Sequence, residues 1–168
     1  VVSDKKDLAG LPEWFIQSAA ADANAKGKDG KWIFTLQSSS RLPFLQYADN
    51  RNLREQIYNA YINRANKGDK NDNKAIISKV ITLRLEKAKL LGFDTYSNFV
   101  LSDNMAKNSD TVMAFLNNLW GYSIANAKKE AAELQQIMDK DGKGEKLAGW
   151  GWWYYSEKLR QEKYNLNE

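Results

Sequence analysis

Two residue types are missing from the sequence altogether: its 168 residues include no histidine and no cysteine. Without cysteine, no disulfide framework can form. Most catalytic zinc sites, every Ser-His-Asp triad and every Cys-His pair require an imidazole, so the chain cannot build these from its own residues. A site made only of carboxylates or lysines is left formally open.

Long hydrophobic runs are also absent. The mean hydropathy is -0.65, and no apolar stretch approaches the roughly 18 residues that a membrane-spanning helix needs, so no membrane partner is predicted. The ten glycines are scattered singly, which excludes a glycine-rich phosphate loop. The net charge of +4 comes from 25 basic and 21 acidic residues mixed along the chain. Nucleic-acid-binding proteins cluster their basic residues on one face, so we predict no nucleic-acid partner.

The start of the sequence has no initiating methionine and no signal-peptide pattern of basic, apolar and small residues. We expect that an upstream portion of the protein precedes Val1. Any export signal would lie in that upstream portion, so export is left open.

Apolar residues recur at helical spacing through most of the chain. This spacing predicts helices over 11–25, 51–66, 72–91, 94–101, 110–139 and 150–165, with a short helix after Pro43. Asn50 or Asp49 is expected to cap the second of these helices. The helix over 72–91 carries two apolar stripes, which predict burial on two sides, and Gly92 is expected to end it in a left-handed conformation.

A single segment, Lys31–Gln37, alternates as a β-strand does, with Trp32, Phe34 and Leu36 on one side. A strand needs a partner, and because no other segment of the chain has this pattern, we expect the partner elsewhere in a longer protein. The predicted fold class is therefore all-α, with one short β-strand over residues 31–37.

Two polar loops imitate calcium sites. Their residues at ligand spacing are Asp139 and Asp141 with Gly144, and Asp69, Asn71 and Asn73. In the first loop, Lys143 and Trp150 stand at positions five and twelve of an EF-hand loop, and a carboxylate is needed at twelve. In the second loop, Lys74 stands where glycine is required. Both segments are interpreted as ordinary polar loops.

The stretch GWGWWYY, residues 149–155, holds half of the six tryptophans. On a helix, Trp152, Tyr155 and Leu159 fall on one side. The other sides carry Trp150, Trp153, Tyr154 and Glu157. A membrane-surface helix is aromatic on one face only, whereas aromatics on all sides predict burial between several elements, with one edge available to line a cavity. We take Trp150, Trp153, Tyr154 and Tyr155 as candidate substrate-channel or domain-seam residues.

Six phrases carry a resemblance to a known family. In order they are LAGLPEWF (8–15), GKWIFTLQ (30–37), RLPFLQYADNRNLREQIYNAYINRA (41–65), DNKAIISKVITLRLEKAKLLGF (72–93), NFVLSDNMAKN (98–108) and WGWWYYSEKLRQEKYNLNE (150–168). Together they resemble the M3 family of zinc metallopeptidases, the thimet oligopeptidase, neurolysin and oligopeptidase A family, and most of all its bacterial peptidyl-dipeptidase (Dcp) branch. The sequence departs from the family's Trp-Asp-x-x-Tyr-Tyr pattern at Gly151, where the aspartate is missing.

The resemblance implies a helical clam-shell fold around a channel, zinc in the parent protein, and a His-Glu-x-x-His helix downstream of the matched residues. It also implies a cytoplasmic location. With no histidine, this chain carries no catalytic residue and no zinc ligand of that family. We interpret residues 1–168 as a single helical segment, an excised non-catalytic part of a longer peptidase that hydrolyses short peptides. Its partner would be the missing catalytic half, and the isolated segment, expected to be inactive, would be prone to self-association.

Two other interpretations are kept open. A free-standing all-α module on a peptidase-derived scaffold would use its aromatic surface to bind a peptide or a partner helix. A carbohydrate or nucleic-acid binder would use the same aromatics for stacking, but the interspersed charge and the aromatic residues on all sides of the helix argue against it.

Overall fold

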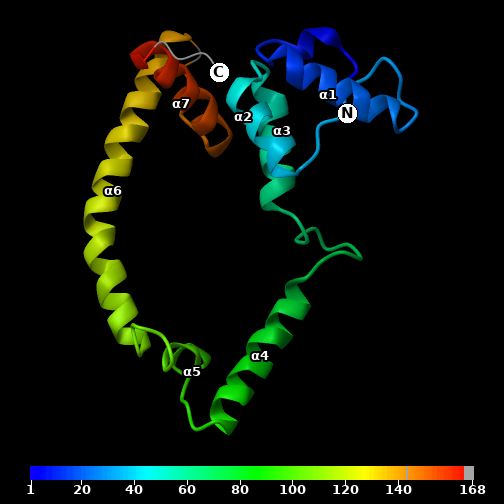
Figure 1. The fold of residues 1–168 in the computed structure, drawn as a ribbon. Helices are drawn as coiled ribbons and strands as arrows, with labels where there is room; N and C mark the ends of the chain where they lie inside the picture. Colours follow the sequence, from blue (N-terminus) through cyan, green and yellow to red (C-terminus); the bar gives the residue numbers. More distant parts are fainter. Residues whose placement is uncertain (143, 165–168) are drawn as a thin grey trace. The chain divides into compact units, whose positions relative to one another are not determined.

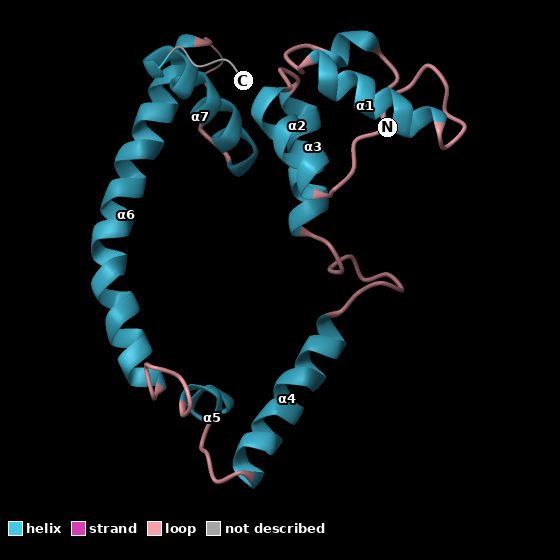
Figure 2. Cartoon of the chain, in the orientation of Figure 1, coloured by secondary structure: helices cyan, strands magenta, loops and turns pink. Residues whose placement is uncertain are grey.

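The computed structural model describes residues 1–142 and 144–164, and there the chain is made of helices joined by loops (Figures 1 and 2). It divides into two compact units, Val1–Asn63 with Glu130–Glu168, and Arg64–Lys129. The first unit holds the 3-10 helix Lys5–Leu8, α1 (Glu13–Asn24), α2 (Ser38–Tyr47), α3 (Arg51–Ile62), the end of α6 (Ser109–Lys140) and α7 (Gly149–Tyr164). The second holds α4 (Lys74–Leu90), α5 (Tyr96–Leu101) and the beginning of α6. The all-α prediction is confirmed. The predicted end of the last helix, Asn165, lies outside the described residues.

Local capping chemistry sets several helix boundaries. The Asn50 side chain accepts a hydrogen bond from the Leu53 amide at the start of α3, as predicted. Gly92, at φ 82°, follows α4. Its amide donates to the Lys89 carbonyl, and the Phe93 amide donates to the Ala88 carbonyl. These two bonds are the Schellman pattern, so the left-handed stop predicted at Gly92 is confirmed.

The β-strand expected over residues 31–37 is wrong for this chain. The structure shows an isolated antiparallel bridge between Val2 and Trp32, so the pairing described for this segment is with the beginning of the same chain. The alternation failed as a strand signal because both sides of the segment are covered. Trp32 and Phe34 pack on the N-terminal core, while Ile33 is buried on the other side and donates its amide to the Ala19 carbonyl of α1.

Two apolar clusters hold the first unit together. The N-terminal cluster consists of Val2, Leu8, Leu11, Phe15, Phe44 and Ala48. The second joins the end of α6 to α7 and consists of Leu134, Ile137, Met138, Tyr154 and Tyr155. Helix α7 also packs against α2 and α3. The aromatic helix is thus enclosed by three other helices, as its aromatic residues on all sides predicted.

The second unit leaves most of its apolar side chains in solvent. In α4 the one buried residue is Ala88. The exposed large apolar residues of α4 and the residue after it are Ile76, Ile77, Val80, Ile81, Leu83, Leu85, Leu90 and Leu91. The beginning of α6 likewise exposes Met113, Phe115, Leu116, Leu119, Trp120, Tyr122 and Ile124. The burial on two sides predicted for the 72–91 helix is therefore wrong within this chain, although both apolar stripes are present.

Candidate functional site

Helix α7 turns its aromatic residues to three neighbours. Trp152, Tyr155 and Leu159 share one side of the helix, as their spacing predicted, and this side faces the end of α6. Trp150 and Trp153 lie beside Tyr58 of α3, with ring centroids 6.0 Å and 6.3 Å from it. No helix within the described residues is both long and apolar enough to cross a membrane.

Arg54 of α3 is the centre of a buried polar cluster that sequence reasoning missed. Its side chain is only 1% exposed. One guanidinium nitrogen, Nη1, donates to the backbone carbonyls of Ala48 and Asp49, and the guanidinium carbon lies 3.9 Å from the centre of the Tyr154 ring. The Tyr154 hydroxyl in turn donates to Asp49 Oδ1 over 2.7 Å. We call Asp49, Arg54 and Tyr154 the arginine cluster, and it fastens α7 to α3 and to the turn before it.

Lys158 extends the arginine cluster along α7. Its ammonium lies 4.7 Å from the centre of the Tyr154 ring and 5.9 Å from that of Tyr155. It also pairs with Asp141 Oδ2 at 3.1 Å, in the loop after α6. Two cations therefore lie within cation–π distance of the Tyr154 ring, whose electron-rich face attracts them.

Burial and hydrogen bonding shift the pKa values of titratable side chains in and beside the arginine cluster. Burial raises the pKa of Tyr154, and the hydrogen bond donated to Asp49 raises it further. Burial also raises the pKa of Tyr155, so both phenols stay protonated and able to donate at neutral pH. Burial acts to lower the pKa of Lys158, but hydrogen bonds with its tyrosine and aspartate neighbours outweigh it and raise that pKa. Burial lowers the pKa of Arg54, which still stays charged.

The four predicted channel or seam residues fall into two pairs. Tyr154 and Tyr155 are buried, at 7% and 2% exposure. Trp150 is half-buried, and its indole Nε1 is covered without a hydrogen-bond partner among the described residues. Trp153 is the most exposed at 37% and lines a shallow pocket of about 330 Å³ with Gln46, Ser156, Glu157 and Arg160. The sequence pattern did not distinguish the buried tyrosines from the more exposed tryptophans. That these four residues line a substrate channel or a domain seam stays a prediction.

Gly149 lets α7 begin close to α3. A Cβ at this position would lie 2.4 Å from the Tyr58 hydroxyl oxygen, so a larger residue would displace that ring. Gly151 is buried and is the third residue of α7, inside the first turn and not at its cap. An aspartate at position 151, as in the family pattern Trp-Asp-x-x-Tyr-Tyr, would therefore lie within the first helical turn.

The loop after α6 uses its polar residues internally. The Gln135 amide nitrogen donates to Asp139 Oδ1 and to the Glu145 carbonyl, and its oxygen accepts from the Leu147 amide. Asp141 pairs with Lys158. Lys143 lies outside the described residues. This loop is organised by a glutamine and a lysine, which agrees with its interpretation as an ordinary polar loop.

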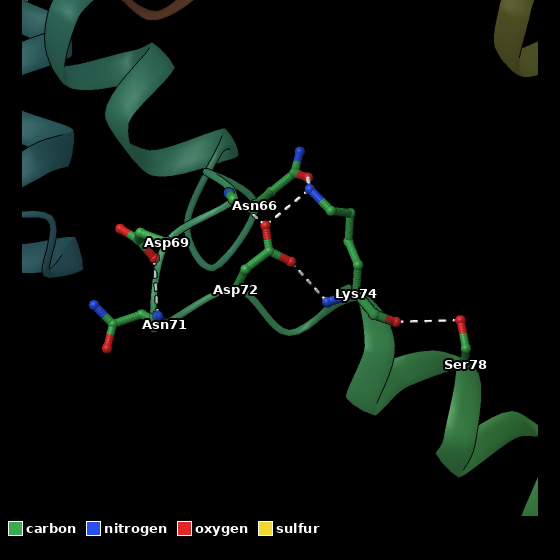
Figure 3. A network of polar contacts seen from close by, with 7 residues as sticks. Asn66, Asp69, Asn71, Asp72, Lys74 and Ser78 are labelled. Carbon is green, nitrogen blue, oxygen red and sulfur yellow. Dashed lines mark hydrogen bonds and ion pairs between the residues drawn. The ribbon is translucent and has the colours of Figure 1, made fainter.

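The second calcium-like loop is shown in Figure 3. Lys74 Nζ lies 2.8 Å from Asp72 Oδ2 and 3.1 Å from the Asn66 side-chain oxygen, neither of which is one of the residues at ligand spacing. Asp72 also accepts from the Gly68 and Lys74 amides, and Asp69 accepts from the Asn71 amide. Within 1–142 and 144–164 there is no group of three or more carboxylates that could hold a metal ion.

Asp72 should titrate far below an ordinary aspartate. The hydrogen bonds from the Lys74 side chain and backbone, and from the Gly68 amide, lower its pKa from 3.8 to about 2. A folded-state pKa below the unfolded value stabilises the loop above pH 4, and this contribution is lost as the pH falls from about 4 to about 2. Carbon-detected NMR titration of the Asp72 carboxyl measures the midpoint. In Lys74→Met the midpoint should move back toward 3.8, and an unchanged midpoint there would contradict the assignment.

No signal in the sequence pointed to the arginine cluster. Arg54 follows the apolar Leu53 at the edge of a stripe in its helix, where exposed arginines are common. Its neighbour Arg51, on the same helix, pairs with Glu145 at 2.7 Å at the surface. The two arginines are indistinguishable until Tyr154, more than ninety residues further along the chain, is placed beside one of them.

Several known proteins are similar in sequence to this chain. It is 39% identical over 172 residues to oligopeptidase A of Haemophilus influenzae and 36% identical over 168 residues to dipeptidyl carboxypeptidase of Escherichia coli, with all of this chain and 25% of each relative covered. It is 30% identical to saccharolysin of Saccharomyces cerevisiae, over 97% of this chain and 23% of that protein. The chain thus spans about a quarter of the length of these relatives. The model of peptidase family M3 matches residues 44–168, which confirms the predicted resemblance: the chain belongs to peptidase family M3.

Proposed function

We propose that residues 1–168 form a scaffold and channel-wall segment of a zinc-dependent peptidase that hydrolyses short peptides. The family membership and the names of the relatives support a peptidase as the whole protein. The observation that carries the scaffold role is the arginine cluster, in which each side chain engages another part of the same unit. Such a cluster positions α7 against α3 and the turn before it. We also propose a cytoplasmic location.

Zinc would be bound outside this chain. The metal chemistry expected for the whole protein is activation of a water molecule and polarisation of the scissile carbonyl. The residues here do not fit the His-Glu-x-x-His site, because the sequence has no histidine and its described part has no suitable carboxylate group. No step of the reaction is therefore assigned to a residue of this chain.

The edge of α7 that carries Trp150 and Trp153 is the proposed channel wall. Trp153 has an exposed indole beside the charged pair Arg160 and Glu157, whose closest atoms are 2.7 Å apart. Trp150 is flanked by Arg51, whose guanidinium lies 5.5 Å from its ring centre. Flat aromatic surfaces edged by paired charges suit contact with an extended peptide, while the buried Tyr154 and Tyr155 hold that edge in place.

The apolar face of α4 is proposed to pack on the remainder of the same polypeptide. Its exposed isoleucines, leucines and valine make a larger apolar surface than a solitary helix keeps in water. The relatives are about four times as long as this chain, so the whole protein offers further polypeptide to cover it. This partner is a part of the same protein and not a separate molecule.

Comparing the chain with the whole protein tests the proposal. The whole protein should hydrolyse short fluorogenic peptides, lose this activity with a zinc chelator, and regain it when zinc is returned. Residues 1–168 alone should bind no stoichiometric zinc and show no turnover above a mock purification. Zinc-dependent turnover by the 168-residue chain would overturn the scaffold role. A whole protein with no activity on any peptide would favour the free-standing binding module instead.

A further inference from the structure

The bridge between Val2 and Trp32 has a defined register. The Val2 amide donates to the Trp32 carbonyl over 2.8 Å, and the Trp32 amide donates to the Val2 carbonyl over 3.0 Å. This is a hydrogen-bonded pair of an antiparallel ladder, in which the next such pair lies two residues away on each strand. Phe34 is the next position on one side, and on the other it is the residue directly before Val1.

The backbone at Phe34 is prepared for such a pairing. The amides of Ile33 and Thr35 point to the opposite edge, where they donate to the Ala19 carbonyl and to Ser40 Oγ. The Phe34 amide and carbonyl, and those of Leu36, make no hydrogen bond within the described residues. Phe34 is half-buried, and its unpaired amide and carbonyl form an edge that another strand can pair with.

A pocket lies on the same face. It has a volume of about 270 Å³, and its apolar lining includes Val2, Phe34, Leu36, Phe44, Leu53 and Ile57. Directly opposed residues in a ladder point to one face, and residues two apart share it. A residue paired with Phe34 would therefore project its side chain beside Val2, toward this apolar lining. The N-terminus lies close to the segment between α1 and α2, which carries Phe34 (Figure 1).

We propose that the residues immediately preceding Val1 in the whole protein pair with Phe34, extending the Val2–Trp32 bridge as an antiparallel strand, and fill the pocket. The relatives are about four times as long as this chain, so further polypeptide is available to form it. The register of the bridge identifies the occupant: the residue directly before Val1 pairs with Phe34 and is apolar. This goes beyond the proposed function, because it concerns assembly of the fold and not peptide hydrolysis.

Hydrogen exchange on the whole protein, read by NMR or by fragmentation mass spectrometry at single-residue resolution, tests the pairing. The Phe34 amide should exchange at least about 100-fold more slowly than an unstructured amide. Proline placed directly before Val1 removes the N–H that would donate to the Phe34 carbonyl, and protection at Phe34 should fall at least about tenfold. Proline one residue earlier is the matched control, because the N–H at that position points away from Phe34. Protection should there stay within about twofold of the original value.

Several results would overturn the proposal. An unprotected Phe34 amide in the whole protein would do so, as would equal loss of protection in both proline variants. Protection that neither variant changes would show that another segment, or a second copy of the chain, fills the site. A gene in which no codon precedes Val1 would also refute it. None of these readouts depends on peptidase activity, so failure here is distinguishable from failure of the proposed function.

Discussion

Replacing Arg54 by alanine is expected to lower the free energy of unfolding by about 3–5 kcal/mol. The side chain is 1% exposed and satisfies the carbonyls of Ala48 and Asp49 while lying on the Tyr154 ring. Alanine would leave both carbonyls without their donor and open a cavity beneath the ring, and both effects are unfavourable. We expect the loss to appear in α7, because the cluster is its link to α3.

Urea denaturation followed by tryptophan fluorescence measures this effect, since three of the six tryptophans are in α7. Arg51→Ala is the matched control on the same helix. Its ion pair with Glu145 is partly exposed, at 23% and 43% for the two side chains, and should cost less than about 1 kcal/mol. Tyr154→Phe keeps the ring but removes the hydroxyl that bonds to Asp49 and interacts with Lys158, and should cost about 1 kcal/mol. Equal losses of unfolding free energy in the two arginine variants would show that Arg54 does not hold the arginine cluster together.

The double change Ile77→Asp with Ile81→Asp should destabilise the whole protein far more than the 168-residue chain. Both side chains are more than half exposed here, at 54% and 61%, so the 168-residue chain should lose less than about 0.5 kcal/mol. In the whole protein, where we propose that this face of α4 is covered, two buried carboxylates should cost at least about 4 kcal/mol. Unfolding of both proteins and peptide hydrolysis by the larger one measure the difference.

The control for that experiment keeps the spacing and the added charge. Ser78→Asp with Thr82→Asp places two carboxylates four residues apart on the polar side of α4, where both hydroxyls bond only to their own helix. It should leave the whole protein active. If both double variants were tolerated equally in the whole protein, the apolar face of α4 would not be covered by it.

Short-range chemistry in the sequence was sufficient for much of the fold. The helix start at Asn50 and the stop at Gly92 were predictable because a cap depends on residues within one turn. Pro43 was misleading. It was expected to precede a short helix, yet α2 begins at Ser38 and contains it. The burial of Phe44 and Leu45 outweighs the backbone hydrogen bond that the proline lacks.

The candidate site was predictable only in outline. The aromatic residues on all sides of α7 correctly indicated several packing partners, because periodicity reports which sides of a helix are apolar. It cannot report which distant residue meets each side. The division into buried Tyr154 and exposed Trp153, and the charged partner Arg54, follow from contacts between residues about a hundred positions apart. The exposure of α4 was not predictable either, because its apolar periodicity is that of a buried helix.

The hydrogen bond between Tyr154 and Asp49 joins residues 105 positions apart, and this separation has a consequence for synthesis. At translation rates of 5–20 residues per second, roughly 5–20 s pass between the emergence of Asp49 and that of Tyr154. The N-terminal apolar cluster uses only residues up to Ala48 and can form during this interval. Arg54 stays hydrated until α7 arrives, so its burial is a late, long-range step on the ribosome. Closing the first unit therefore waits for the whole of residues 64–129 to be made.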